Sequence, residues 1–581
     1  MHLNRQTYLS LAVRSAFFAA TMTLGWTASN TQAQDSGSET WFGKMTAGGR
    51  QFRFAVKLQE SEKRWTGKLI SLDEGNAEFV LSDVTNDGSQ LGFSLKQTQA
   101  TYEGKVSEGN SDGKWKQRGS DIDLDFERVV EIPRPAIKSL WTGTINVIVQ
   151  KLDIQIRELE SGEIFLDSIS QKVGGFIANR SESEGKITLE VPALKASFEG
   201  ELSDDGTQMI GTWKQGFLSP SLTLTKEKKP DEVLAKSNSP NRPQMPKAPF
   251  PYTSTKVTFK NEADGVTLAG TLTVPNETLG SAPAVILVSG SGAQDRDESL
   301  AGHKPFWVIA DHFSRNGIAV LRFDDRGVGE STGNFATATS VDFARDVQAG
   351  VNFLKAHPKV AEDQVGICGH SEGGLIAPMV AADDKEIAFI ILMAGLGVNG
   401  EKIVTSQGAL ILKASGMDDE TIEREGKVQQ ALIDLAKVKP PLSNEDFRKQ
   451  AKELLEDFTG GAKPEQVDAL IAGAVSQLRT PWFEYFMAYE PSTNLEKVTC
   501  PVLAINGEKD LQVEPNLNLA AIKAALEKAP TEEFKLIEIP NLNHLFQNCQ
   551  TGLLQEYSEI EETFDANTLT LMSEWIQGVV Q

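Results

Sequence analysis

Ser371 is the residue whose surroundings in the sequence point most clearly to chemistry. It lies in VGICGHSEGGLIAPMV, where an apolar, strand-like run comes before it and a helix-forming run comes after it. Gly369 and Gly373 complete a G-x-S-x-G pattern, which suits a turn so sharp that larger side chains would clash with a strained serine backbone. This setting predicts an exposed, nucleophilic hydroxyl rather than a serine in an ordinary tight turn.

A serine nucleophile needs a general base, and the base needs an acid that holds it in the right tautomer. When the serine lies on a strand-turn-helix elbow, the acid and then the histidine follow it along the chain. His2 lies in an N-terminal apolar segment, and four other histidines precede the serine: His303, His312, His357 and His370. His544, in the loop sequence PNLNHLFQ, is therefore predicted to be the base.

Two acidic residues compete for the third role. Asp510 and Glu508 both follow the strand-like run PVLAING, at the edge of a sheet where ligands collect. We favour Asp510, because a turn at Gly507 should carry the chain outward before the acid points back.

The negative oxygen formed by nucleophilic attack requires backbone N–H donors that are already in place. Glu372, directly after the nucleophile, should supply one, and Ser291 in LVSGSGAQDRD should supply the other. This glycine-rich loop could instead hold a phosphate, but it lacks the spacing of either nucleotide-binding pattern. We expect the acidic and basic residues around it to buttress the loops: Asp295, Arg296, Asp297, Asp324, Asp325 and Arg326.

Aromatic residues could line a substrate pocket beside these groups. Trp482, Phe483 and Phe486 are candidates, although packing between elements explains them equally well. No pair of histidines, and no histidine with carboxylates, has the spacing of metal ligands. The sequence therefore predicts neither a metal nor a cofactor.

From about residue 252, apolar strand-like runs alternate with helical patterns. Examples are AVILVS, IAVLRF, VGICG and FIILMAG, and this alternation predicts a mostly parallel, doubly wound sheet with helices on both faces. Charged, helix-favouring sequence interrupts the pattern before PVLAING. We expect this stretch, about 400–495, to form a helical cap.

The N-terminal half contains an internal repeat. YEGKVSEGNSDGKWKQRG and FEGELSDDGTQMIGTWKQG align, which defines copies at about 40–130 and 140–226. Short alternating runs between turn residues predict all-β modules, either two small ones or the halves of one barrel. Trp115 and Trp213 lie at the same offset, which favours core positions over a glycan-binding surface. A proline-rich linker, 227–251, should follow.

The N-terminus has the pattern of a secretory signal peptide, 1–33. A weakly basic start leads into AFFAATMTLGW, which is too short to span a bilayer, and small residues end at Ala33. We therefore expect export to the periplasm or beyond, with no stable membrane span. The formal net charge of -23 argues against nucleic acid as a partner. Three cysteines allow one disulfide at most, and buried thiols are the favoured interpretation.

Several blocks together resemble a group of bacterial alpha/beta-hydrolase carboxylesterases related to serine aminopeptidases. The blocks are VSGSGAQDRD, RFDDRGVGEST, GHSEGG, TPWFEYF, PVLAINGEKDLQV and NHLFQ, and the resemblance covers nearly everything from Tyr252 onward. It implies an alpha/beta-hydrolase fold and hydrolysis of carboxylic esters, with Ser371, Asp510 and His544 as the triad. The repeats resemble β modules that precede secreted hydrolases, which implies an architecture and no activity.

The sequence thus predicts an exported serine hydrolase for small esters of short or medium acyl length. A peptidase or amidase is the first alternative, because the same triad cleaves amides when a pocket for a peptide N-terminus exists. The second alternative is an envelope protein whose β repeats bind glycan or protein beside a vestigial hydrolase.

Overall fold

The computed structural model describes residues 38–580 with short gaps. The chain divides into one compact unit up to Asn241 and a second from Arg242 onward. The predicted signal peptide, 1–33, lies outside the described residues. The gaps are 62–63, 74–76, 96–99, 118–119, 134, 148–149, 171–172, 184, 216–218, 231–232, 235–241, 277–279, 439–441, 460–470, 472–477 and 532.

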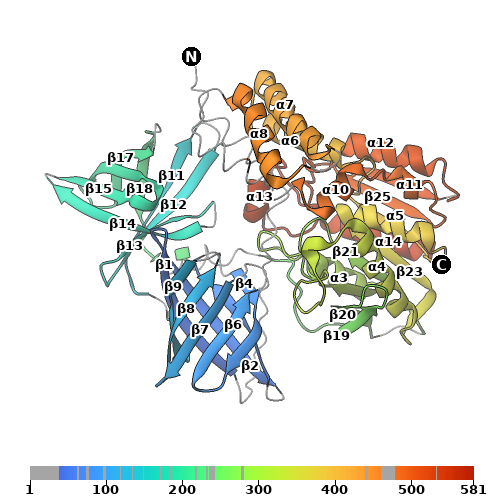
Figure 1. Ribbon diagram of the computed structural model, residues 1–581, viewed down its shortest axis with the longest axis horizontal. Helices are drawn as coiled ribbons and strands as arrows, with labels where there is room; N and C mark the ends of the chain where they lie inside the picture. Colours follow the sequence, from blue (N-terminus) through green and yellow to red (C-terminus); the bar gives the residue numbers. More distant parts are fainter. Residues whose placement is uncertain are drawn as a thin grey trace. The chain divides into compact units, whose positions relative to one another are not determined.

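The first copy of the repeat forms a β-barrel. Its neighbouring strands are antiparallel, and β1 pairs with both β2 and β10, which closes the sheet (Figure 1). The strands are β1 (Ser38–Ala47), β2 (Arg50–Ser61), β3 (Arg64–Ser71), β4 (Ala77–Val80), β5 (Ser82–Asn86), β6 (Gln90–Leu95), β7 (Ala100–Ser107), β8 (Asn110–Gln117), β9 (Ser120–Asp123) and β10 (Asp125–Val129).

The second copy closes in the same way. Each strand pairs with the next, and β18 returns to β11. The strands are β11 (Ile137–Val147), β12 (Gln150–Leu159), β13 (Ile164–Ser168), β14 (Val173–Ser183), β15 (Lys186–Val191), β16 (Ala196–Leu202), β17 (Gln208–Gln215) and β18 (Ser221–Lys226).

The two barrels place equivalent aromatic residues in their cores. Trp115 on β8 lies opposite Tyr102 on β7, and Trp213 on β17 lies opposite Phe198 on β16. All four side chains are buried. These tryptophans therefore fill barrel interiors and do not offer a platform to a ligand.

The second unit is built on an eight-stranded sheet in the order β19-β20-β22-β21-β23-β24-β25-β26. Neighbours from β22 to β26 are parallel, whereas β19 and β20 add an antiparallel edge. The strands are β19 (Tyr252–Asn261), β20 (Val266–Pro275), β21 (Ala282–Val288), β22 (Ala319–Phe323), β23 (Val360–His370), β24 (Ile390–Met393), β25 (Val502–Gly507) and β26 (Phe534–Ile539).

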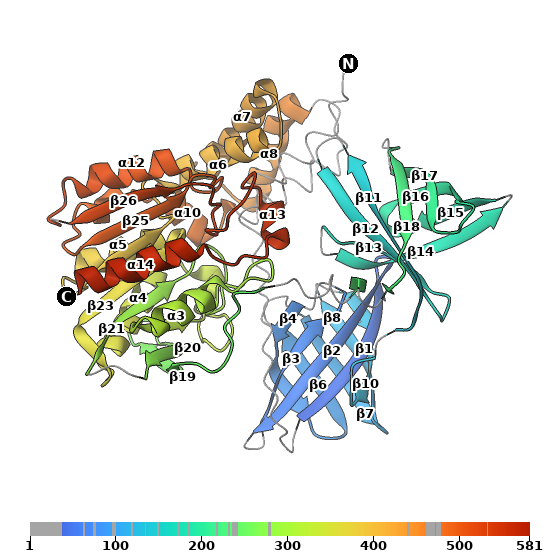
Figure 2. The same ribbon diagram turned by 180° about the vertical axis from the view of Figure 1, so that it is seen from behind.

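Helices cover both faces of this sheet. Helices α3 (Pro305–Arg315) and α14 (Ala566–Val579) pack together, and Figure 2 shows them in front of the strands. On the other face, α4 (Ser340–Lys355) packs on α5 (Glu372–Asp383), and α12 (Pro515–Leu526) covers β25 and β26. Strands β21, β24 and β25 are almost wholly buried, as is β23 from Val365 to His370, because helices remove both faces from water. The alpha/beta-hydrolase fold predicted from the sequence is confirmed.

Helices inserted between β24 and β25 form the segment in which a cap is expected. They are α6 (Gly400–Ala414), α7 (Asp419–Ala436), α8 (Asn444–Thr459), α10 (Pro481–Ala488) and α11 (Ser492–Leu495). A short helix, α13 (Leu554–Glu559), precedes α14. No helix in the described part of the chain is long and apolar enough to cross a membrane.

Part of the predicted linker belongs to the second unit. The Arg242 guanidinium donates hydrogen bonds to the carbonyl oxygens of Ala301, Gly302, Ser558 and Ile560. These bonds fasten Arg242 to the loop at Ala301 and Gly302 and to the C-terminal end of α13.

Candidate active site

The turn that carries Ser371 has the geometry of a nucleophile elbow. Ser371 joins β23 to α5 and adopts φ 53° and ψ −115°, outside the conformations that a non-glycine residue favours. A Cβ atom at Gly369 would lie 2.0 Å from the carbonyl oxygen of Gly373, and one at Gly373 would lie 2.1 Å from that of Val288. The close approach of these backbones therefore explains both glycines.

His544 and Asp510 form a buried hydrogen-bonded pair. His544 Nδ1 lies 2.8 Å from Asp510 Oδ2. The other carboxylate oxygen, Oδ1, accepts the N–H groups of Gln512 and Val513 at 2.8 and 2.9 Å, which fixes the carboxylate in place. A carboxylate at Nδ1 holds a proton there and leaves Nε2 free to accept one.

Glu508 takes no part in this pair. Its carboxylate accepts the N–H of Asn541 instead, at 2.9 Å. Of the two candidates for the acid, the structure thus places only Asp510 on the histidine.

The strand order brings the elbow next to the histidine loop. The ring of His370, the residue before Ser371, lies with its centroid 4.7 Å from that of the His544 ring. Within the described residues, the Ser371 hydroxyl has no hydrogen-bond partner. Such bonds are often long in the absence of substrate, so this geometry is compatible with proton transfer from Ser371 to His544.

Two backbone N–H groups beside Ser371 are free to bind an oxyanion. In the described part of the chain, the N–H groups of Ser291 and Glu372 have no hydrogen-bond acceptor, whereas that of Gly290 donates to Glu298 Oε1 at 2.8 Å. A Cβ atom at Gly290 would lie 3.2 Å from Ser371 Cβ, so this loop passes directly over the elbow. The structure therefore brings both predicted donors to the nucleophile.

The Glu372 side chain has a second connection that the sequence did not suggest. Its Oε1 accepts hydrogen bonds from the Ser340 hydroxyl at 2.6 Å and from the Trp482 indole N–H at 2.7 Å. The Ser291 side chain lies close enough to lower the pKa of this carboxyl group. Burial raises the pKa of Glu372 despite these donors. One carboxyl group thus links the elbow, α4, α10 and the loop at Ser291.

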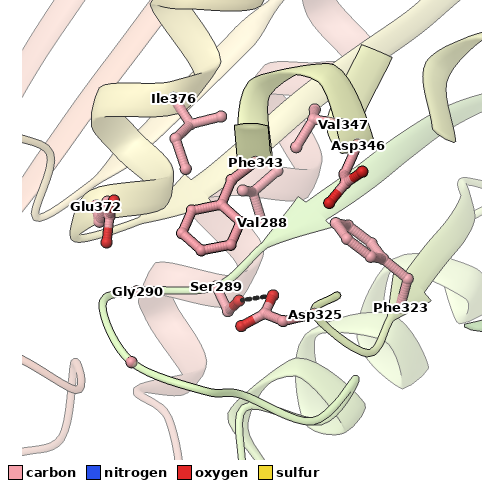
Figure 3. A pocket seen from close by; sticks show the side chains of 11 residues that line it. Val288, Ser289, Gly290, Phe323, Asp325, Phe343, Asp346, Val347, Glu372 and Ile376 are labelled. Carbon is pink, nitrogen blue, oxygen red and sulfur yellow. Dashed lines mark hydrogen bonds between the residues drawn. The ribbon is translucent and has the colours of Figure 1, made fainter. Parts of the chain in front are cut away.

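The acidic residues at the end of β22 support that loop. The Asp325 carboxylate accepts the Ser289 hydroxyl at 3.1 Å and the Gln294 N–H at 2.9 Å; Figure 3 shows the first of these bonds in a small cavity beneath the loop. Burial raises the pKa of Asp325 well above its usual value. Asp324 forms a bidentate ion pair with Arg296. These contacts buttress the loop.

The three aromatic residues on α10 have different surroundings. Phe483 and Phe486 are buried, and Phe486 packs against Gly400 of α6. Trp482 is half-buried, stacks on Phe486 at 4.9 Å, and reaches the elbow through Glu372. Of the three, Trp482 is the one that contacts Glu372, the residue after Ser371.

Trp482→Phe is expected to destabilise the second unit by about 1 to 3 kcal/mol, because a buried carboxyl group loses a donor while the aromatic packing remains. Calorimetric unfolding measures the change. Trp575→Phe is the matched control, since the described residues offer its indole N–H no acceptor. Equal losses in the two variants would show that packing rather than the hydrogen bond accounts for the effect.

Sequence reasoning missed two members of the site, His370 and Glu298. His370 Nδ1 lies 2.9 Å from Glu298 Oε1, and both side chains are buried. The sequence did contain a signal, because His370 is the second residue of the G-x-S-x-G pattern. Its place before Ser371 in the chain excludes it as the base but leaves a positioning role open. No group of three or more potential metal ligands occurs among the described residues.

Comparison with known proteins gives matches in the second unit. Residues 264–537 match the family model described as X-Pro dipeptidyl-peptidase (S15 family). Esterase EstD of Thermotoga maritima is 27% identical over 278 residues, which are 48% of this chain and 58% of the relative. A polyketide transferase of a Penicillium species is 33% identical over 136 residues, or 23% of this chain and 42% of the relative. The chain thus spans about half the length of these curated relatives.

Solved structures of hydrolases are similar as well. The esterase Pf2001 of Pyrococcus furiosus shares 17% identity and a TM-score of 0.34, covering 58% of this chain and 97% of the other. The chain is thus similar to an esterase and, over residues 264–537, to a peptidase family.

Proposed function

We propose that this protein hydrolyses small carboxylic esters, with Ser371 as nucleophile, His544 as general base and Asp510 as the acid that orients it. The observation that carries the proposal is the buried His544–Asp510 pair beside a strained serine elbow. The similarity to Esterase EstD supports ester bonds as the substrate class.

The reaction proceeds through an acyl-enzyme. Ser371 Oγ attacks the ester carbonyl carbon while His544 Nε2 takes the hydroxyl proton, and the carbonyl oxygen becomes an oxyanion bound by the N–H groups of Ser291 and Glu372. The carbon–oxygen bond to the alcohol then breaks, and His544 returns the proton to the alcohol. Water, deprotonated by His544, releases the acid and restores Ser371. We infer short or medium acyl groups, because α10 lies beside the elbow through the bond from Trp482 to Glu372, and a helix in this place is expected to limit access.

A peptidase is the second candidate, and one observation favours it. The family model that matches residues 264–537 is described as an X-Pro dipeptidyl-peptidase. Such an enzyme must also bind the amino group of its substrate. No acidic pair in the described inserted helices can be assigned to that task, so the ester remains the proposed substrate.

Parallel assays separate these candidates. Purified full-length protein is tested on para-nitrophenyl esters of increasing acyl length and on Gly-Pro and aminoacyl anilides. Ester turnover with a kcat/KM at least about 100-fold above that of every anilide supports the proposal. Dominant turnover of the Gly-Pro anilide would replace it with the dipeptidyl-peptidase activity.

We also propose that the protein is exported and that its barrels contact glycan or protein. The signal-peptide pattern in 1–33 supports the first statement, and the separation of the barrels into their own compact unit supports the second. Fractionation of the native host tests export, and a glycan array probed with the full chain tests binding. Cytoplasmic recovery, or an array without bound glycan, would count against the respective statement.

A further inference from the structure

His370 lies between the two loops that the proposed chemistry uses. Its ring is buried, with 7% of the side chain exposed. Nδ1 lies 2.9 Å from Glu298 Oε1, in the segment that follows the oxyanion loop. Nε2 lies 2.9 Å from the backbone carbonyl oxygen of His544. One imidazole ring therefore contacts both the segment after the predicted oxyanion loop and the loop that carries His544.

Both partners of this ring are hydrogen-bond acceptors. A carbonyl oxygen can only accept, and Glu298 Oε1 already accepts the N–H of Gly290 at 2.8 Å. A neutral imidazole has a single N–H and can donate to one of the two partners. An imidazolium ring has two and can donate to both.

The surroundings of the ring favour the charged form. Burial alone would lower the pKa of His370, but the Glu298 carboxylate, the His544 carbonyl and the more distant Asp510 together raise it above its usual value. The titratable groups that face His370 are the carboxylates of Glu298 and Asp510 and the neighbouring His544 ring.

We propose that His370 is a positioning residue, whose imidazolium ties Glu298 and the Gly290 amide to the backbone at His544. The ring would thereby hold the oxyanion donors and the base at a fixed separation on either side of Ser371. This inference rests on the proposed function, because it assigns His370 a role in the same reaction. His370 itself exchanges no proton with substrate.

The direction of the pH effect follows from the raised pKa. The unfolded chain has an ordinary histidine pKa of about 6.5. The stabilisation by the charged ring is therefore complete below about pH 6.5, and it is lost as the pH rises through the higher folded-state pKa of His370. At a pH above this pKa the neutral ring donates a hydrogen bond to only one of the two loops. The value of kcat should therefore fall as the pH rises through the pKa.

The charge on His370 can be observed directly by 15N NMR of the full chain labelled at histidine. At about pH 6.5, the ordinary pKa of an imidazole, the His370 ring should be mainly in the form with two protonated nitrogens. His312, whose pKa is lowered by burial, should show a neutral ring in the same spectrum. The variants His370→Gln and His312→Gln assign the two signals. A neutral His370 ring would overturn the proposal.

Kinetics test the positioning role. His370→Gln should lower kcat for an ester by about 10- to 100-fold with little change in KM, because the donors and the base lose their alignment. His312→Gln, which alters a histidine on α3 that is hydrogen-bonded to Ser573 of α14, should leave kcat unchanged. Glu298→Gln is a milder change that keeps an acceptor for Gly290, and it should move the alkaline limb of the kcat profile to lower pH.

Two results would overturn the positioning role: an unchanged kcat in His370→Gln, or an unmoved alkaline limb in Glu298→Gln. Covalent labelling of wild-type protein with a fluorophosphonate separates this failure from that of the proposed function. Labelled Ser371 together with an unaffected His370→Gln variant refutes only the role of His370. Wild-type protein without labelled Ser371 refutes the serine mechanism itself.

Discussion

Ser371→Ala is expected to lower kcat/KM for para-nitrophenyl esters by about 10,000-fold or more, since removal of a triad nucleophile leaves only the contributions of oxyanion binding and substrate binding. KM should change little, because the hydroxyl contributes to bond formation rather than to binding of the ground state. Initial rates over a range of ester concentrations give both constants.

The Ser371→Ala protein should fold normally. Alanine is smaller than serine, and the positive φ of this position is held by the surrounding elbow. Circular dichroism and unfolding curves that match the wild type are the control. Ester turnover that survives in a well-folded variant, in preparations free of contaminating esterase, would refute Ser371 as the nucleophile.

Local sequence predicted the elbow well because the geometric requirement is local. Gly369 and Gly373 are needed by backbone contacts within a few residues of Ser371 and with the adjacent strand β21. The alternation of apolar runs likewise predicted the parallel sheet, since buried strands must be apolar on both faces. The fold of the second unit could therefore be predicted from patterns within short stretches of the sequence.

The contacts of Glu372 and His370 could not be predicted in this way. Glu372 meets Trp482, which is 110 positions away, and His370 meets Glu298 and His544, at separations of 72 and 174 positions. No periodicity or motif in a single sequence encodes such pairings. The repeat could not be resolved from sequence either, because two separate modules and two halves of one barrel have the same sequence pattern. Only the strand pairs β1–β10 and β11–β18 show that each copy closes on itself.

The choice between Asp510 and Glu508 shows where sequence reasoning ends and geometry begins. Both acids follow β25 within three residues, so spacing alone favours neither strongly. In the structure, the Asp510 side chain is fully buried against His544, whereas Glu508 binds the N–H of Asn541. The two positions therefore form a matched pair for mutagenesis.

Asp510→Asn should lower kcat/KM for esters by about 10,000-fold, because an amide can donate a hydrogen bond to Nδ1 and so favour the tautomer in which Nε2 carries the proton and cannot act as a base. Asparagine is nearly the same size as aspartate, so the loss of activity should appear without gross unfolding. Steady-state assays and a fluorophosphonate labelling rate, which should fall in parallel, measure it.

Glu508→Gln is the control for this prediction, since it makes the same chemical change two residues away. Its activity should remain within about 3-fold of the wild type, because a side chain bound to the Asn541 amide does not orient the base. The reverse result, a severe loss in Glu508→Gln and near-normal turnover in Asp510→Asn, would transfer the acid role to Glu508. Comparable severe losses in both would mean that each carboxylate supports the histidine loop, and that tautomer control by Asp510 alone is the wrong account.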